Sequence, residues 1–338
     1  MNWKDQIKGD PISWLLEPGD AAVRHLALRD LVDKNKNDPE LVAARKAAHT
    51  NPPITTILDQ MNPEGWWAKP GGGYSPKYFS AVWSLLSLAQ MGAELVMDER
   101  IATACHYYLD HAFTQRGQTS VNGTPSFTID CLQGNMLTTL LDLGCQDPRL
   151  DLAFEWMART VTGEGIAPAQ EKQAALRYYG YKCGPDFACG PNNKQPCAWG
   201  GVKVMLAFSR LAREKRTPII QRAIDRGVEF FFKVDPVTAD YPNGNAKDTP
   251  SRNWWKFGFP VFYITDLLQL AEAFVGLGYG KDPRLANTLK LILEKQDGQG
   301  RWSLEYHYNR KTWVETGRGG QPSKWVTLRA LRVLKKAS

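Results

Sequence analysis

The residues best suited to chemistry in this sequence are one aspartate and three cysteines near the starts of two apolar stretches. Asp130 and Cys131 open a stretch that runs to residue 143, Cys197 opens another that runs to residue 211, and Cys189 lies just before it. A buried carboxyl has a raised pKa and can act as a general acid. An aspartate at a helix start also caps backbone N–H groups, and the sequence alone favours that structural role.

The cysteines have two interpretations. If Cys131, Cys189 and Cys197 meet at one point, three thiolates and a fourth ligand from Asp130, His307 or water would hold a zinc ion. Their spacing is not that of a standard zinc knuckle, and buried free cysteines are common in protein cores. Zinc is therefore the less favoured alternative to three packed thiols.

Aromatic side chains gather near the expected helix starts and the loops beside them. Such rings would line an apolar pocket and stabilise positive charge, although packing in the core is the favoured alternative. The candidates for substrate contact are Trp67, Trp83, Trp199, Trp254, Trp255 and Tyr263.

Several polar residues lie on or beside stretches that are otherwise apolar. A buried polar or charged group needs a partner, so Asn135, Asp266 and Arg329 either form internal pairs or line a wet cavity, and pairing is favoured. His307 and Glu305 could act together as an acid and a base, although a single loop histidine is more often solvated.

The elements that must position these residues form a repeat. Helix starts of the form Asp-x-x-apolar occur at Asp38, Asp98, Asp147 and Asp282, where the aspartate is a natural N-cap. A Gly follows the last apolar residue at Gly92, Gly144 and Gly278, and glycine takes the left-handed conformation that ends many helices. The ordered recurrence of starts and stops indicates an internal helical repeat.

Two kinds of helix alternate along the chain. Stretches that are apolar on all sides begin near residues 22, 80, 130, 197, 261 and 323, and one-sided amphipathic stretches lie between them. Doubly buried helices alternating with half-buried ones predict an all-α (α/α)6 toroid, a double ring of inner and outer helices, forming one domain over residues 1–338. The segments 161–196 and 235–260 lack periodicity and are expected to be loops.

At this point the sequence resembles a known family. The spacing Q-x3-G-x-W at Gln296, Gly300 and Trp302, with a looser copy from Gln60 to Trp67, is similar to the QW motif of squalene and oxidosqualene cyclases. With the helix alternation, residues 20–336 resemble the superfamily of prenyltransferase and squalene-cyclase repeats, whose fold is an α/α toroid. The resemblance implies an isoprenoid or another apolar small molecule in a central cavity, with cyclisation or prenyl transfer as the reaction and Asp130 as the acid.

The chain departs from the family in its chemical motifs. It has no D-x-D-D quartet, and the D-C-T-A-E context of the oxidosqualene cyclases is reduced to Asp130 and Cys131. Cys197 follows Gln195-Pro196 where the prenyltransferase zinc site has Asp-x-Cys, and no histidine opens the stretch at residue 261. A binding or scaffold protein without catalysis therefore stays an alternative, as does an enzyme acting on polysaccharides, since (α/α)6 barrels host both.

Composition narrows the partners. The 338 residues are 43% hydrophobic and carry a net charge of +7, with basic residues scattered rather than clustered. This argues against a nucleic-acid partner and allows a weak peripheral contact with anionic membranes. No apolar run is long enough to span a bilayer and no signal peptide is visible. With six cysteines and no secretory signal, we expect a cytoplasmic, reduced, soluble protein.

Overall fold

The computed structural model describes residues 3–180, 182–244 and 253–338, and nearly all of its regular structure is helical. The two short strands, β1 (Ala188–Cys189) and β2 (Gln195–Pro196), pair antiparallel with each other. The predicted all-α class is confirmed. Among the described residues no helix is long and apolar enough to cross a membrane. Part of both predicted loop segments, residue 181 and residues 245–252, lies outside the described residues.

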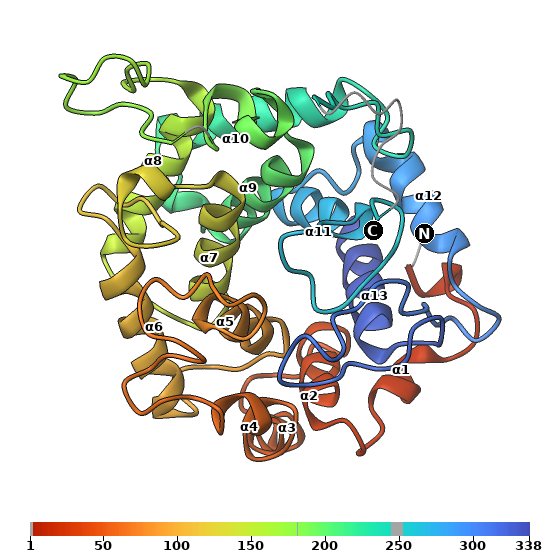
Figure 1. Cartoon of the computed structure of the whole chain (residues 1–338). Coiled ribbons are helices and arrows are strands. Elements are labelled where there is room, and N and C mark those ends of the chain that lie inside the picture. Colours follow the sequence, from red (N-terminus) through yellow and green to blue (C-terminus); the bar gives the residue numbers. More distant parts are fainter. Residues whose placement is uncertain (1–2, 181, 245–252) are drawn as a thin grey trace.

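The helices that the sequence predicts as apolar pack on one another in chain order. Figure 1 shows them around the centre of the molecule, and α5 contacts α7, α7 contacts α9, α9 contacts α11, α11 contacts α13, and α13 contacts α2. Leu26 of α2 also contacts Gly92 just after α5. The bounds are α2 (Ala21–Asp30), α5 (Ala81–Gln90), α7 (Asp130–Asp142), α9 (Ala198–Arg210), α11 (Leu267–Leu277) and α13 (Lys324–Ala337).

The amphipathic helices lie outside this central set in Figure 1. Each packs on a central helix next to it in the chain: α3 on α2, α6 on α5, α8 on α7, α10 on α9 and α12 on α11. Their bounds are α3 (Pro39–Thr50), α6 (Glu99–Ala112), α8 (Arg149–Thr162), α10 (Pro218–Phe232) and α12 (Ala286–Glu294). The remaining short helices are η1 (Trp3–Gln6), α1 (Pro11–Leu15), α4 (Ile54–Leu58), η2 (Pro125–Phe127), η3 (Pro185–Phe187), η4 (Gly190–Asn192), η5 (Arg213–Lys215) and η6 (Pro283–Leu285).

The repeated helix starts share one capping arrangement. Asp147 accepts the backbone N–H of Arg149 at 2.9 Å, and the Arg149 guanidinium folds back to donate to the same carboxylate at 2.8 Å. Asp98 with Arg100 and Asp282 with Arg284 form the same two contacts. Each carboxylate thus satisfies a free backbone N–H and pairs with a cation at the start of a helical segment. Asp98 is the N-cap of α6, Asp147 lies one residue before Pro148, the N-cap of α8, and Asp282 is the N-cap of η6 just before α12.

The two tryptophan turns are also equivalent. The indole N–H of Trp302 donates to the Ile292 carbonyl at 2.7 Å, and that of Trp67 donates to the Ile57 carbonyl, also at 2.7 Å. Both indoles are almost fully buried, and in both copies the acceptor lies ten residues earlier. The tryptophans therefore fasten the turn to the end of the preceding helix.

The glutamines of the two turns differ. Gln296 is buried and its amide bonds to the N-terminal segment, accepting from Lys8 N–H at 2.9 Å and donating to the Gln6 carbonyl at 3.0 Å. Counting back six residues from Trp67 gives Met61, and Gln60 beside it is exposed. Because of the extra residue in the looser copy, the side chain of its glutamine is exposed to solvent.

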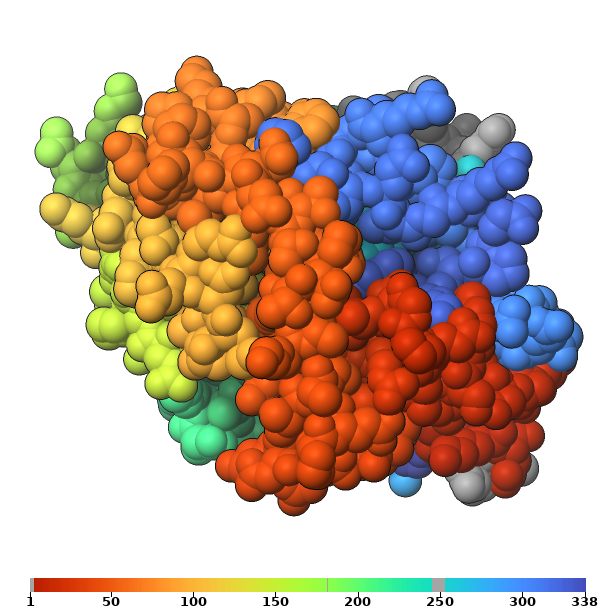
Figure 2. All heavy atoms as spheres, turned by 90° about the horizontal axis from the view of Figure 1, so that it is seen from below, coloured from red at the N-terminus to blue at the C-terminus, as the bar shows by residue number. Residues whose placement is uncertain are grey.

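The two ends of the described chain meet along a seam. In Figure 2 the N-terminal segment lies directly against the C-terminal one. Besides the Gln296 contacts, Lys324 pairs with Glu17 at 2.8 Å and Lys335 pairs with Asp33. Since α13 also packs on α2, the first and last central helices are neighbours.

One predicted boundary is wrong. The apolar stretch expected to begin at residue 261 becomes helical only at Leu267. Asp266 caps α11 by accepting the Gln269 N–H at 2.7 Å, so the chain before it is free to run across the centre of the molecule. That segment, residues 259–263, is called the crossing segment below.

Candidate functional site

The crossing segment separates two cavities. Phe259 and Val261 line a cavity of about 770 Å³, whereas Tyr263 lines one of about 600 Å³. The larger, the charged cavity, is bounded by residues of α2, α5, α7, α9, α11 and α13, mostly from their C-terminal halves. The smaller, the aromatic cavity, lies at the N-terminal ends of α7 and α9.

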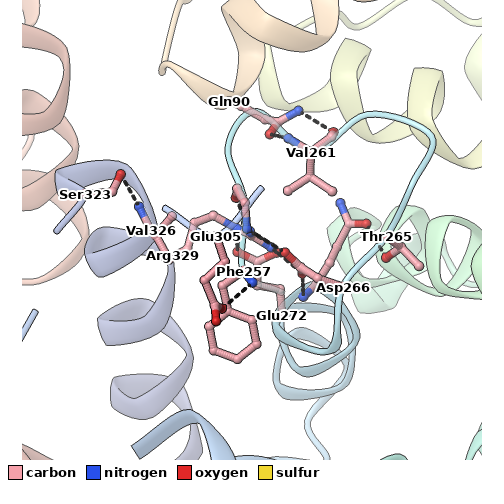
Figure 3. A network of polar contacts seen from close by, with 12 residues as sticks. Gln90, Phe257, Val261, Thr265, Asp266, Glu272, Glu305, Ser323, Val326 and Arg329 are labelled. Carbon is pink, nitrogen blue, oxygen red and sulfur yellow. Dashed lines mark hydrogen bonds and ion pairs between the residues drawn. The ribbon is translucent and has the colours of Figure 1, made fainter. Parts of the chain in front are cut away.

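Two side-chain amides hold the crossing segment in place. The Gln90 side chain of α5 makes two hydrogen bonds with the Val261 backbone, as Figure 3 shows: it accepts the N–H at 2.8 Å and donates to the carbonyl at 2.9 Å. Asn135 of α7 donates to the Phe262 carbonyl at 3.4 Å. Because a buried backbone group needs a partner, these amides replace the hydrogen bonds that regular structure would supply.

Six aromatic side chains line the aromatic cavity. Tyr74, Tyr241 and Phe187 join the predicted Trp199, Trp254 and Tyr263. At its edge the Lys77 ammonium lies 4.8 Å from the Tyr263 ring centre and 5.0 Å from that of Tyr74. Burial lowers the pKa of Lys77. Faces that hold a lysine in this way can also hold a positively charged part of a ligand.

Asp130 contributes an acid to this cavity. It is the first residue of α7 and does not cap it, because Ile129 is the N-cap. The favoured structural role is therefore wrong. The side chain is 5% exposed, and its Oδ2 has no hydrogen-bond partner in the part of the chain described. Burial raises the pKa of Asp130 to about 8, against hydrogen bonds from the Gly184 N–H and Thr160 that lower it.

The three predicted cysteines all line the aromatic cavity. Cys197 is the N-cap of α9, and its pKa is lowered to about 7, first by the Cys189 thiol and then by the Gly200 and Trp199 N–H groups, against burial. The same thiol contact raises the pKa of Cys189, so the proton of this pair resides on Cys189. Burial raises the pKa of Cys131 to about 12, which leaves it a thiol.

The zinc site is not found. In residues 3–180, 182–244 and 253–338, no group of three or more His, Cys, Asp or Glu side chains is arranged to hold a metal ion. The cysteines share one cavity, but only Cys189 and Cys197 are brought side by side, on the β1–β2 pair and the start of α9. His307, offered as a fourth ligand, does not line the cavity.

The charged cavity is organised by Arg329. Its guanidinium donates to Asp266 at 3.0 and 3.1 Å, to Glu272 at 2.8 and 2.9 Å, and to the Gly258 carbonyl at 2.7 Å. Figure 3 shows this cluster between α13 and α11. All five N–H donors of the arginine are thereby used. Asp266 and Arg329, predicted as substrate contacts, form an internal ion pair, the favoured alternative for them.

Further ion pairs surround the same cavity. Arg210 of α9 donates to Asp142 of α7 at 2.9 Å, and Asp30 of α2 receives both Arg29 and Arg332. Although burial acts against it, these two arginines lower the pKa of Asp30. The cavity is thus charged, but its carboxylates are matched by cations.

The remaining predicted contacts lie elsewhere. Trp67 is buried in its turn, and the Trp83 indole packs on Tyr74 and donates its N–H to the Tyr74 carbonyl. Neither residue lines the charged or the aromatic cavity. Trp255 donates to the Val237 carbonyl and is also absent from both walls. Asn135 lines the charged cavity, where it supports the crossing segment.

Glu305 and His307 are not a catalytic pair within either cavity. Glu305 accepts the Phe257 N–H at 2.8 Å and pairs with Lys295 at 2.7 Å. His307 is exposed, and its Nδ1 accepts the Asn309 N–H at 3.3 Å. An isolated β-bridge between Tyr306 and Gly258 also holds this segment in place. Both side chains therefore contribute to local structure.

Sequence reasoning missed Tyr74, Lys77, Phe187 and Tyr241. The first two follow the glycine-rich stretch at residues 71–73, and the other two lie in the segments that had no periodicity. Their aromatic or cationic type was visible in the sequence. Their convergence was not, because it depends on loop paths.

Comparisons with known proteins give a structural likeness only. No protein-family model matches the chain, and no curated protein matches it. The type II terpene cyclase MstE from Scytonema aligns at 13% identity over 88% of this chain and 97% of its own, with a TM-score of 0.33. A variant of that enzyme in complex with geranylgeranyl dihydroxybenzoate aligns at 14% identity, with the same coverages and TM-score. A protein from Actinoplanes aligns at 12% identity over 87% of this chain and 99% of its own, with a TM-score of 0.31.

Proposed function

We propose that this chain is an (α/α)6 toroid of the terpenoid-cyclase type that binds an isoprenoid or a similar apolar molecule in the aromatic cavity. The succession of contacts from α5 through α13 to α2, with the amphipathic helices outside, supports the double ring. The cavity has the size of a small-molecule site, and six aromatic side chains contribute to its wall. We further propose that the chain is an enzyme in which Asp130 protonates the ligand.

The observation that carries this function is the state of Asp130. A carboxyl with a pKa of about 8 keeps its proton at neutral pH. Asp130 is one of the residues that line the aromatic cavity, and its buried Oδ2 has no hydrogen-bond partner among the described residues. Protonation of an alkene or an epoxide needs such an acid beside faces that stabilise the resulting cation. The carboxyl is held by Gly184 and Thr160 rather than spent on a cap.

The polysaccharide alternative is less well supported. Glycoside hydrolysis generally uses two carboxyl groups on either side of the bond that is cleaved. Asp130 is the sole carboxyl among the described residues that line the aromatic cavity. The charged cavity has several, but they are engaged in ion pairs.

Two measurements test the proposal. Farnesol and geranylgeraniol should raise the melting temperature of the wild type, since a ligand that binds the folded state stabilises it. Trp199→Ala should weaken this shift, and Trp255→Ala, outside the cavity, should not. Absence of any shift in the wild type would refute the binding site.

For catalysis, isoprenoid alkenes and epoxides are incubated with the protein in D2O. Protonation by Asp130, whose proton exchanges with solvent, should place one deuterium in the product. Asp130→Asn should bind with the same thermal shift and form no labelled product. If the wild type binds but forms none either, the chain is a binding protein on the same fold.

A further inference from the structure

The sulfur of Cys197 sits where a helix stabilises negative charge. Cys197 is the N-cap residue of α9, a helix of 13 residues, and the Trp199 and Gly200 N–H groups at this helix start help to lower the pKa of its thiol. The free N–H groups and the dipole at a helix start favour a thiolate over a thiol, and the thiolate is the nucleophilic form. The Cys189 thiol lies beside the same sulfur and is the largest cause of the lowered pKa of Cys197.

The sulfur is also open to the cavity. Cys131, Cys197 and Gly200 all belong to the cavity wall. A methyl group added at Gly200 would lie 4.0 Å from the Cys197 Sγ and 4.0 Å from the Cys131 backbone nitrogen. Glycine therefore leaves free the space between the two helix starts, beside the sulfur.

A second, independent feature points to a ligand at the same place. Asp130 lines the same cavity and is only 5% exposed. Its Oδ2 has no hydrogen-bond partner among the described residues. Its carboxyl is near enough to feel the charge on Cys197. A buried polar atom without a partner is costly, and a bound ligand would supply the missing contact.

We propose that the aromatic cavity takes apolar ligands bearing an α,β-unsaturated carbonyl group, with Cys197 adding to the β-carbon and Asp130 supplying the proton. This deepens the proposed function, because it rests on the aromatic cavity as the binding site and names the ligand class. A nucleophile and an acid in one pocket match this group in particular. Attack at one carbon creates a negative charge on the conjugated system, and that charge must then be protonated.

The step balances without an oxidant or a leaving group. A sulfur electron pair of Cys197 forms the S–C bond, and the C=C π pair moves into the enolate. The enolate takes the Asp130 proton at the α-carbon, giving a saturated carbonyl compound bound through a thioether. The carboxylate then regains the proton that the thiol released, so one thiol and one alkene become one thioether.

The test uses trans-2-nonenal, which joins an enal to an apolar chain. Intact protein is incubated with it, reduced with borohydride, digested and mapped by mass spectrometry. The peptide with Cys197 should gain the whole aldehyde without loss of water, which separates thioether formation from imines on lysine. Labelling should exceed that of glutathione by on the order of 10²-fold, the usual contribution of a positioned acid. Nonanal should give no adduct on sulfur.

The variants assign the roles. Cys197→Ser should abolish the adduct, whereas Cys145→Ser, which removes a buried sulfur that lines neither cavity, should label like the wild type. Asp130→Asn should slow addition of the enal on the order of 10²-fold and leave alkylation by iodoacetamide unchanged, because iodoacetamide requires no proton. An equal effect of Asp130→Asn on both reagents would mean that Asp130 merely supports the fold, and would overturn its assignment.

The failures of the two proposals are distinguishable. If farnesol raises the melting temperature but trans-2-nonenal labels Cys197 no faster than glutathione, the ligand class is wrong and the isoprenoid site stands. Labelling on Cys131 or Cys189 instead would also overturn the proposal. If Cys197 is labelled rapidly although farnesol has no effect, the nucleophile stands and the isoprenoid ligand is wrong.

Discussion

The charged cavity and the aromatic cavity lie on opposite sides of the crossing segment and differ in how their polar groups are satisfied. On the charged side Arg329 uses every N–H it has, and Asp30 and Asp142 each face an arginine. On the aromatic side there are fewer polar groups, yet Asp130 keeps an oxygen without a hydrogen-bond partner among the described residues, and the pKa of Cys197 is lowered to about 7.

This difference between paired and unpaired polar groups indicates which cavity supports the fold and which is the candidate site. Ion pairs in the charged cavity connect the central helices: α13 with α11, α7 with α9, and α2 with α13. Groups left incomplete cost stability and persist where a ligand completes them. The larger and more strongly charged hollow is therefore the supporting one, and the smaller apolar hollow is the candidate site.

The largest loss of folding stability is expected from Arg329→Ala. It leaves Asp266 buried without its cation, and breaking a buried pair from one side costs about 3–5 kcal/mol. Urea unfolding measures the loss. Arg329→Met combined with Asp266→Asn and Glu272→Gln removes all three charges and should recover much of the stability. Equal losses in the single and the triple variant would show that the ion pairs are not what the charged cavity contributes.

Asp130→Asn should increase the folding stability. The folded-state pKa of Asp130 is raised from 3.8 to about 8, so its contribution to stability is complete below pH 3.8 and is lost as pH rises towards 8. The amide does not ionise, and across that window the stability of the variant should rise relative to that of the wild type by about 1.4 kcal/mol for each pH unit. Unfolding curves at several pH values test this. A constant difference would refute the raised pKa.

Gln90→Leu tests the wall between the cavities. It removes both bonds to Val261 and leaves a buried N–H and C=O unpaired, which should cost about 2 kcal/mol. The exposed Gln60→Leu is the matched control and should leave stability unchanged. Proteolysis near residue 261 should rise in the Gln90 variant alone. Unaltered cleavage would show that the crossing segment holds its place without the amide.

Lys335→Ala should have the smallest effect. Its pair with Asp33 lies at the edge of the charged cavity, and Asp33 is largely exposed. An exposed ion pair contributes less than about 1 kcal/mol, and salt screens it further. Urea unfolding at low and high salt should differ little from the wild type. A loss as large as that of Arg329→Ala would remove the distinction between core and rim.

The sequence predicted the helices well where a local signal fixed them. The Asp98, Asp147 and Asp282 starts bind their own backbone, so each boundary is encoded within three residues. The start expected at residue 261 was wrong because an apolar run does not distinguish a buried helix from a buried irregular segment. Only the tertiary contact of Val261 with Gln90, 171 positions away, shows which it is.

The site was predicted in part. Trp199, Trp254, Tyr263, Asp130 and the three cysteines share the aromatic cavity, as the convergence of helix starts suggested. The role of Asp130 could not be read, because a cap and an acid have the same signature at a helix start. The distinction is made by Ile129 at the cap and by Gly184 from a distant loop, and a loop path leaves no periodic pattern.

The seam described above bears on how the chain is made. Helix α2 leaves the ribosome long before the helix it packs on, α13, which is residues 324–337. During translation, the face of α2 that packs on α13 therefore stays uncovered until α13 has been made, and it offers a site for chaperones in the meantime. Gln296, which ties residues 6–8 to the last third of the chain, can join them only near the end of that wait.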